Sequence, residues 1–210
     1  MARKKVLSKE QVLECSFRMI NTTGLEKVTI RAIANELGTS TAPIYTHYEK
    51  MSDIKSDLAR YVDKKLMDSL KSEYTENPFY NIGVGLLTFA FDHKKVFQTY
   101  YLTNNTLITK IVDSSPEFID NMKTGSFLSL LSEEKLKSLI DDMWVYTFGL
   151  AAIICINNES DTLQNYLDQL EKTGERLIMY HLFSTGNIEK CFTIINQNLH
   201  KCANKESLIV

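Results

Sequence analysis

The side chains best suited to bind another molecule through hydrogen bonds form one short run near the start of the chain. Positions 40–48 contain Ser40, Thr41, Tyr45, Thr46, His47 and Tyr48. Hydroxyl, phenol and imidazole groups donate and accept hydrogen bonds, so they can bind phosphate oxygens and the edges of bases. Ile44 is the clearest apolar anchor in the run. Most of this segment must therefore face something other than its own core.

Two short helices joined by a tight turn, over Thr29–Tyr48, are expected to position this run. The first helix has one apolar face, formed by Ile30, Ile33, Ala34 and Leu37. Gly38 should end it, because glycine takes a positive φ without steric cost. Ser40 should cap the second helix, and Pro43 must lie in its first turn. The spacing fits a helix-turn-helix, which binds the major groove of DNA, and equally an ordinary helical hairpin in an all-α core.

A family resemblance favours the helix-turn-helix. The chain resembles the DNA-binding signature of the TetR family of bacterial transcriptional regulators, in order and spacing, at Thr29, Arg31, Ile33-Ala34, Leu37-Gly38, Ser40, Ile44-Tyr45 and His47-Tyr48. The resemblance implies an all-α protein with an N-terminal three-helix DNA-binding bundle and a larger helical domain for effector binding and dimerisation. The chain departs from the family at Met51, where a lysine usually contacts phosphate. Lys50 or Lys55 is expected to supply that charge.

The expected DNA-binding residues lie on the second helix and around it. Candidate contacts on the helix are Thr41, Ala42, Tyr45, Thr46 and His47, and those around it are Thr29, Arg31, Ser40, Pro43, Lys50 and Lys55. Thr29, Arg31 and Lys50 should bind phosphates and set the register without reading sequence. The second helix has no arginine, so the commonest guanine contact is missing and A·T contacts with bridging waters are expected.

The charge of the chain is uneven. Residues 1–60 contain ten Lys or Arg and seven Asp or Glu, whereas the whole chain contains 24 and 26. A positive end on an acidic protein agrees with nucleic acid bound at that end only. Arg3, Lys4 and Lys5 form either an arm for the minor groove or a solvated basic terminus. The composition, 44% hydrophobic and 24% charged, is that of a soluble globular protein.

Catalytic and metal sites are not expected. Asp141-Asp142 and Glu133-Glu134 are adjacent pairs, so their side chains diverge on a helix and form surface charge. Cys15, Cys155, Cys191 and Cys202 lie far apart, which favours free thiols in a reducing cytoplasm. His200 and Cys202 alone make a weak metal site. We therefore expect no enzyme, no cofactor and no metal.

A membrane location is not expected either. The basic start of the chain is followed by polar residues, unlike a secretory signal. The longest apolar stretch, 144–156, is shorter than the roughly 20 residues that cross a bilayer, and a buried helix is the interpretation. These features predict a cytoplasmic protein.

Local signals along the chain predict a first helix that starts with a capping box at Ser8 and Gln11 and ends at Gly24. A long helix should follow near 52–74, ended by Asn77-Pro78. Further helices are expected near 117–131, 133–156, 162–183 and 188–200. Two domains follow: 1–51 for DNA and 52–210 for ligand binding and dimerisation. The resemblance implies that the helices near 133–156 and 162–183 pair with those of a second copy in a four-helix bundle. Packing within one chain is the alternative.

Aromatic residues are dense after position 79. Most belong to the core, but Tyr100, Phe127, Trp144 and Phe148 are candidate ligand contacts. The resemblance implies a small hydrophobic or amphipathic effector. The predicted function is a repressor that binds a pseudo-palindromic DNA operator as a homodimer and is released by this effector. The alternative is a TetR-like architectural DNA-binding protein that responds to no small molecule.

Overall fold

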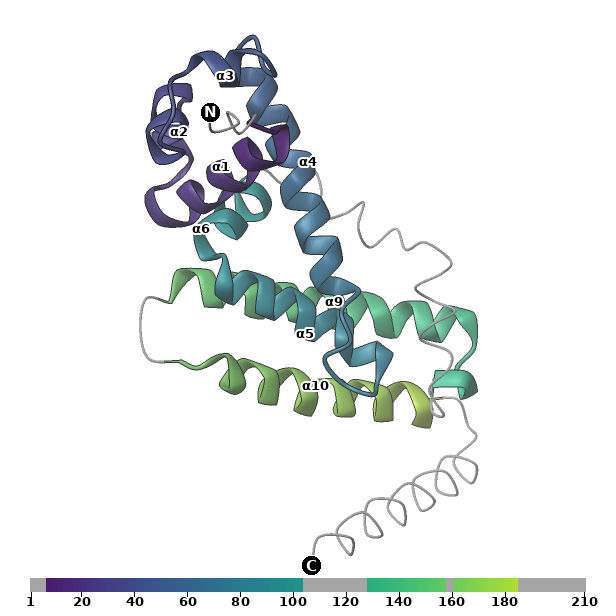
Figure 1. Ribbon diagram of the computed structural model, residues 1–210. Coiled ribbons are helices and arrows are strands. Elements are labelled where there is room, and N and C mark those ends of the chain that lie inside the picture. The colour runs from purple at the N-terminus through teal and green to yellow at the C-terminus, as the bar shows by residue number, and fades with distance from the viewer. Residues whose placement is uncertain (1–6, 104–127, 158–160, 185–210) are drawn as a thin grey trace, which may run out of the picture.

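The computed structural model describes residues 7–103, 128–157 and 161–184, and these residues are helical with no β-strand among them (Figure 1). The predicted all-α class is therefore confirmed. The expected helix near 188–200 lies outside the described residues. So does the expected helix near 117–131, except for a 3-10 turn at Leu128–Leu130.

An N-terminal bundle contains α1 (Lys9–Thr23), α2 (Ile30–Glu36) and α3 (Ala42–Tyr45), with a 3-10 turn at Leu25–Lys27. The predicted capping box starts α1: Gln11 N donates to Ser8 Oγ at 3.2 Å, and Ser8 N donates to Gln11 Oε1 at 2.9 Å. Gly24 ends α1 with φ +90°, a backbone conformation that residues other than glycine rarely adopt. Local sequence signals therefore define this helix at both ends.

The long helix α4 (Met51–Leu70) leaves the bundle and runs toward the other helices (Figure 1). Its buried stripe is Ile54, Leu58, Val62, Leu66 and Leu70. The helix ends at Leu70, earlier than predicted. Asn77-Pro78 does not end it but starts the next helix, where Asn77 Oδ1 accepts from Phe79 N at 3.1 Å. The prediction was wrong because a proline suits the first turn of a helix as well as the residues beyond one.

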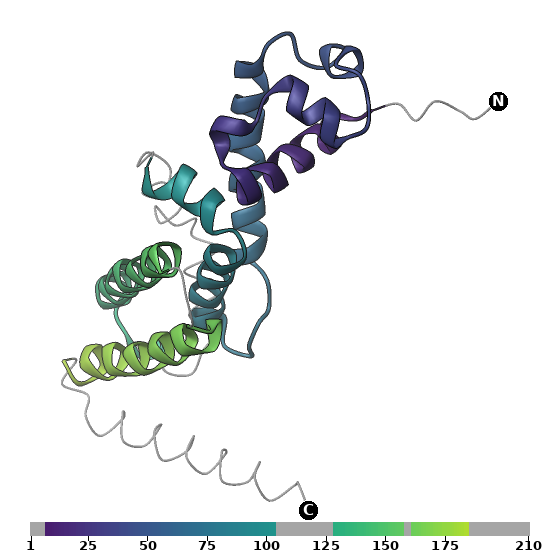
Figure 2. The ribbon, with the colours of Figure 1, turned by 90° about the vertical axis from the view of Figure 1, so that its left-hand side faces the viewer.

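The remaining helices are α5 (Pro78–Asp92), α6 (Lys94–Phe97), a π-helical turn (Gln98–Leu102), α9 (Glu133–Ile156) and α10 (Leu163–Phe183). The two long predicted helices near 133–156 and 162–183 are thus present. Helix α5 packs against α4, α9 and α10, and α9 also packs against α10. Figure 2 shows these helices beside the lower part of α4, on one side of it, and the N-terminal bundle at the upper end of α4.

Helix α9 contains the whole of the longest apolar stretch, 144–156. In the part of the chain that the structure describes, it is the one helix long and apolar enough, by length and composition only, to cross a membrane. The sequence argument against a membrane span considered only the apolar stretch 144–156. It therefore does not apply to the whole 24-residue helix. Core helices of soluble proteins meet the same criterion, and α9 packs against α5 and α10 along the side that contains Leu139, Leu150 and Ile154.

Aromatic rings join the N-terminal bundle to the other helices. Phe17 of α1 packs edge-on against Tyr61 of α4, with ring centroids 5.9 Å apart. His93, between α5 and α6, lies 4.8 Å from the Phe17 ring and 5.1 Å from the Phe89 ring. Burial lowers the pKa of His93, and its Nδ1 has no hydrogen-bond partner among the described residues. The bundle is therefore held by α1 against both α4 and the α5–α6 junction.

Candidate nucleic-acid interface

The turn between α2 and α3 has the geometry of a helix-turn-helix. Thr29 caps α2, because its Oγ1 accepts from Ala32 N at 3.2 Å. Gly38 has φ +63°, and Thr39 N donates back to Ala34 O at 2.9 Å, so the chain leaves α2 in a tight turn. Ile33 and Ala34 of α2 and Ile44 of α3 are buried in the core. The predicted left-handed glycine at the end of α2 is confirmed.

Helix α3 begins one residue later than the predicted cap implied. Thr41, not Ser40, is the residue before its first turn, and no side chain caps it. The Thr41 carbonyl accepts from Ile44 N and Tyr45 N at 3.0 and 3.1 Å. Thr41 already has helical backbone angles, φ −71° and ψ −21°, whereas a side-chain cap requires an extended residue. The prediction that Ser40 caps this helix is therefore wrong, and Ser40 is exposed.

The outer face of α3 is open. Ile44 is fully buried, whereas Ala42 and Thr46 are exposed and the Tyr45 side chain is 53% exposed. Thr41 and Pro43 are half-buried. Thr46 Oγ1 donates to Pro43 O at 2.6 Å, which uses its proton and leaves it as a hydrogen-bond acceptor. Tyr45 thus has the most prominent polar group on this face.

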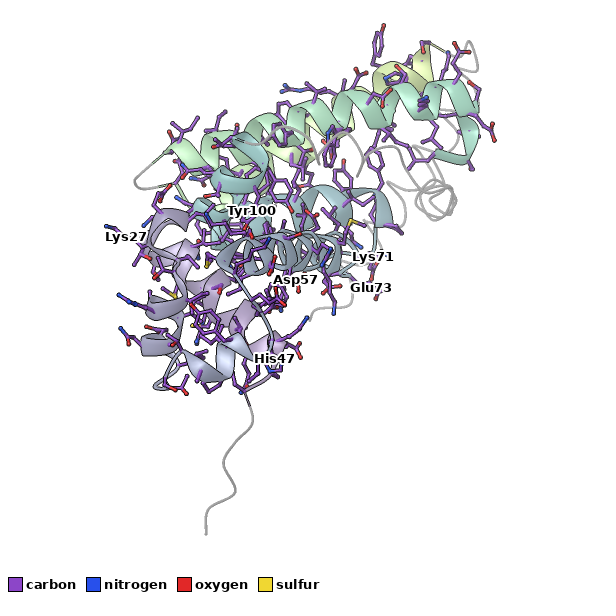
Figure 3. The ribbon with its side chains drawn as sticks, turned by 90° about the horizontal axis from the view of Figure 1, so that it is seen from above. Lys27, His47, Asp57, Lys71, Glu73 and Tyr100 are labelled. Carbon is purple, nitrogen blue, oxygen red and sulfur yellow. The ribbon has the colours of Figure 1, made fainter. Side chains whose placement is uncertain are left out.

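His47 differs from the other candidates. Its Nε2 lies 2.6 Å from the carbonyl oxygen of Leu7, just before α1, and the ring is half-buried. A carbonyl oxygen can only accept, so Nε2 is the donor and Nδ1 is the nitrogen left for any other partner. Figure 3 shows His47 at the edge of the N-terminal bundle that faces away from α9 and α10.

The candidate phosphate contacts lie at the starts of α2 and α4, the helices before and after α3 in the chain. Thr29, Arg31, Lys50 and Lys55 are all exposed. The Thr29 hydroxyl accepts the cap bond and keeps its own proton for donation. Lys50 precedes α4 and its backbone N donates to Asp53 Oδ2 at 3.3 Å, so its backbone is tied to the first turn of α4. Met51 is half-buried and packs against the core. The position at which the family usually has a phosphate-binding lysine is therefore occupied here by a packing residue.

A charged cluster links the start of α1 to Tyr48, after α3, and to α4. Lys9 Nζ lies 5.0 Å from the centre of the buried Tyr48 ring and 4.0 Å from Asp57 Oδ2, and Arg60 also pairs with Asp57. Burial, followed by the neighbouring Asp57 carboxylate, raises the pKa of Tyr48 to about 12. These contacts fix the start of α1 and the first turns of α4 next to the end of α3.

A second feature is an apolar cavity between α5, α9 and α10, with a volume of about 50 Å³. Its lining residues are Phe79, Tyr80, Ile82, Gly83, Leu86, Ile140, Met143, Trp144, Thr147 and Leu170. None of these is charged. Thr147 Oγ1 donates to Met143 O at 2.6 Å, so it offers the cavity only an acceptor. The cavity suits an uncharged apolar group.

The structure separates the ligand candidates. Trp144 lines the cavity, whereas Tyr100 and Phe148 are not among its lining residues. Phe148 packs against Phe97, with ring centroids 5.9 Å apart, and Tyr100 is buried beside Tyr101. Phe127 lies outside the described residues. The sequence could not identify Leu170 or Ile140 as cavity residues, because an aliphatic side chain on a helix gives no signal that distinguishes a cavity from a filled core.

The acidic pairs on α9 do not converge. Asp141 and Asp142 are exposed, and Asp142 Oδ2 lies 3.0 Å from Nε2 of the buried His181 on α10, so this carboxylate ties two helices together. The residues that the structure describes contain no group of three or more potential metal ligands. Cys191, His200 and Cys202 lie outside those residues. Cys15 and Cys155 are buried free thiols.

Comparison with known sequences gives partial matches. No protein-family model matches the chain. An HTH-type transcriptional regulator of Staphylococcus aureus (strain MRSA252) is 28% identical over 109 residues, which are 48% of this chain and 57% of that protein. The nucleoid occlusion factor SlmA of Shewanella amazonensis is 25% identical over 69 residues, 33% of this chain and 35% of that protein. The matches thus cover little more than half of the first relative and about a third of the second.

Solved structures match over most of the chain. A TetR-like transcriptional regulator from Rhodococcus sp. RHA1 has a TM-score of 0.56 and 13% identity, over 83% of this chain and 97% of that one. A TetR from Streptomyces coelicolor has a TM-score of 0.56 and 15% identity, over 82% and 98%. A TetR variant from Acinetobacter baumannii AYE, in complex with minocycline, has a TM-score of 0.51 and 14% identity, over 82% and 95%. At these identities the similarity establishes the fold.

Proposed function

Because this chain has the fold of the TetR-family transcriptional regulators, we propose that it is a DNA-binding transcriptional regulator that acts as a homodimer. Two copies of α3 would enter successive major grooves of a pseudo-palindromic operator, about 34–36 Å apart. More specifically, the protein would be a repressor that is released from its operator when a small apolar effector binds. Residues 1–51 would form the DNA-binding domain and residues 52–210 the effector and dimerisation domain, in the cytoplasm.

The observation that carries the proposal is the asymmetry of α3. One residue of this four-residue helix, Ile44, is fully buried, while Tyr45 is 53% exposed with its hydroxyl available. A helix in an ordinary hairpin would bury a wider apolar face. Exposed Arg31 and Lys50 flank this helix at the ends of α2 and α4, where they can bind the backbone on both sides of a groove.

A homodimer is supported by an apolar surface on α9 and α10. Val145 is 72% exposed and Ile156 67% exposed on α9, with Ile153 between them, and Tyr180 is 67% exposed on α10. Gly149 lies on the same face of α9, and nothing stands within 4 Å of where its Cβ would be. A second helix can therefore approach closely along this face. Ala151, two residues after Gly149 on α9, is fully buried and faces the protein's own core.

An effector site is supported by the uncharged cavity beside Trp144. At about 50 Å³ it holds only a few atoms as it stands, so α9 or α10 would have to shift to admit a larger molecule. Helix α5 lines the cavity and also packs against α4, which follows α3 in the chain. An effector that binds better to the shifted arrangement would therefore change the spacing of the two DNA-binding bundles and favour the state that does not bind DNA.

Binding to duplexes selected from a random library tests the DNA-binding proposal. Tyr45→Ala and Arg31→Ala should each lower affinity for the selected duplex by about tenfold or more. Lys71→Ala is a matched control for the loss of one positive charge, because Lys71 follows α4, some 30 Å along that helix from Met51. Figure 3 shows Lys71 away from His47. Equal effects of Arg31→Ala and Lys71→Ala would show that affinity comes from overall charge, and selection of no duplex would refute the function.

A second candidate is an architectural DNA-binding protein that responds to no small molecule. The observation that favours this second candidate is the similarity, over 69 residues, to a nucleoid occlusion factor. The two candidates differ in ligand response. A sensor should be stabilised by at least one apolar compound in a thermal-shift screen, and the loss of that shift when Trp144 is replaced would assign the ligand to the cavity.

A further inference from the structure

Two threonines among the candidate DNA contacts use their hydroxyl groups in opposite ways. Thr29 Oγ1 accepts from Ala32 N at 3.2 Å, so its own proton stays available for donation. Thr46 Oγ1 instead donates to the Pro43 carbonyl at 2.6 Å, so toward any further partner it can only accept. One hydroxyl is therefore left as a donor and the other as an acceptor.

The course of the backbone at the end of α3 explains why the Thr46 proton is used. In a continuing helix, the Pro43 carbonyl would accept from His47 N, four residues later. His47 N donates instead to Ile44 O at 3.0 Å, and Tyr48 N donates to the same oxygen at 3.0 Å. The Pro43 carbonyl takes its hydrogen bond from the Thr46 hydroxyl. Because Thr46 is exposed, its oxygen is an accessible acceptor with a fixed role.

An acceptor at this place distinguishes between the groups that DNA presents. Phosphate oxygens are acceptors, so Thr29 can donate to them directly and Thr46 cannot. In the major groove the donors are the exocyclic amino groups, N6 of adenine and N4 of cytosine, whereas N7 and O6 of guanine and O4 of thymine accept. The Thr46 oxygen therefore matches a base amino group and matches neither phosphate nor the major-groove edge of guanine.

Ala42 favours one of the two amino groups. It is exposed and lies four residues before Thr46, so the two side chains are neighbours on one side of the helix. An A·T pair presents the adenine amino group together with the thymine methyl group, whereas a C·G pair presents an amino group without a methyl group. A methyl group beside an acceptor thus fits an A·T pair better than a C·G pair.

We infer that Thr46 is a specificity-determining residue, whose Oγ1 accepts from the N6 amino group of an adenine in the operator while Ala42 contacts a thymine methyl group. The inference rests on the proposed function and names the base that this position reads. It also divides the threonines by role: Thr29 binds the backbone and sets the register, and Thr46 reads sequence.

Duplexes that lack single functional groups test this contact. The full-length wild type first selects a duplex from a random library. Each adenine of a half-site is then replaced in turn by purine, which lacks the N6 amino group, or by 7-deazaadenine, which keeps the amino group and lacks the N7 acceptor. At the adenine read by Thr46, purine should lower affinity by about tenfold and 7-deazaadenine by less than about twofold. Purine at the other adenines is the control for the lost base-pairing hydrogen bond.

Two variants assign the sensitive adenine to Thr46. Thr46→Val keeps the branched shape without the hydroxyl, whereas Thr46→Ser keeps the hydroxyl and can still donate to the Pro43 carbonyl. At that adenine, purine should cost Thr46→Ser about tenfold, as in the wild type, and Thr46→Val less than about twofold, because a contact already removed is not lost again. Thermal unfolding checks that both variants fold.

Several results would overturn the inference. If purine costs the wild type and Thr46→Val equally at every adenine, Thr46 reads no adenine amino group. If 7-deazaadenine is the damaging replacement at the position coupled to Thr46, the threonine donates instead of accepting. Coupling of Thr46 to a cytosine, measured with 2-pyrimidinone in its place, would reject the adenine assignment. The purine and 7-deazaadenine comparison needs only the wild type, so finding no adenine at which purine alone is damaging would overturn the inference even if the variants fold poorly. Selection of no duplex by the wild type would instead refute the proposed function itself.

Discussion

The crossing of α4 and α5 depends on the absence of a side chain at Gly85. A Cβ at this position would lie 2.3 Å from the Ser69 carbonyl oxygen and 3.0 Å from the Leu70 Cα, which are backbone atoms of α4. Real Cβ contacts essentially never fall below 3.0 Å, so the helices would have to separate by about 0.7 Å, the difference between 3.0 and 2.3 Å. This separation would also stretch the hydrogen bond from Ser69 Oγ to Gly85 O, now 2.9 Å.

Gly85→Ala should therefore destabilise the protein strongly. Overpacking against backbone costs about 3 kcal/mol, and the stretched hydrogen bond about 1 kcal/mol. Alanine in place of glycine stabilises a helix by about 1 kcal/mol. The expected net loss in the free energy of unfolding is about 3 kcal/mol, or a melting temperature lower by about 6–12 °C. Urea unfolding followed by circular dichroism measures it, at equal protein concentrations because a dimer's stability depends on concentration.

Gly83→Ala is the matched control, because it makes the same change two residues earlier on α5. Its Cβ would lie 2.9 Å from Leu170 Cδ2, the end of a flexible side chain that can move aside. Its free energy of unfolding should stay within about 1 kcal/mol of wild type. If the two variants lose the same stability, or if Gly85→Ala loses none, the close backbone approach does not determine the α4–α5 crossing.

Three further predictions concern the dimer face, pH and the cavity. Val145→Asp should convert the proposed dimer to a monomer in analytical ultracentrifugation, since an unpaired carboxylate buried in an interface costs several kcal/mol, and an unchanged mass would place the interface elsewhere. Burial lowers the pKa of His93 below its ordinary value of 6.5, so the unfolded chain takes up the proton first and stability should fall as the pH falls below about 6.5. Urea unfolding of His93→Gln should show a smaller fall, and equal pH slopes for the two proteins would contradict this. Trp144→Ala should reduce the thermal shift caused by apolar ligands, whereas Val145→Ala, whose side chain points out of the cavity, should not.

The sequence by itself determined the features that depend on residues within one or two helical turns. Ser8 and Gln11 start α1, Thr29 starts α2, and Gly38 turns the chain after it, because each acts on backbone groups three to five residues away. The long helices α9 and α10 were predictable for the same reason, since apolar periodicity is read along one segment. These signals were sufficient for the all-α class and for the position of the two short helices, while the family resemblance favoured a helix-turn-helix over an ordinary hairpin.

Only the tertiary structure decided which residues from different helices meet. Asn77-Pro78 can follow one helix or start the next, and packing decides between these alternatives. The cavity takes its walls from three helices, so its lining depends on their relative rotation. His47 has its partner 40 residues earlier, at Leu7. A hydrogen bond over that separation leaves no pattern in the local sequence, because it depends on how α1 and α3 pack.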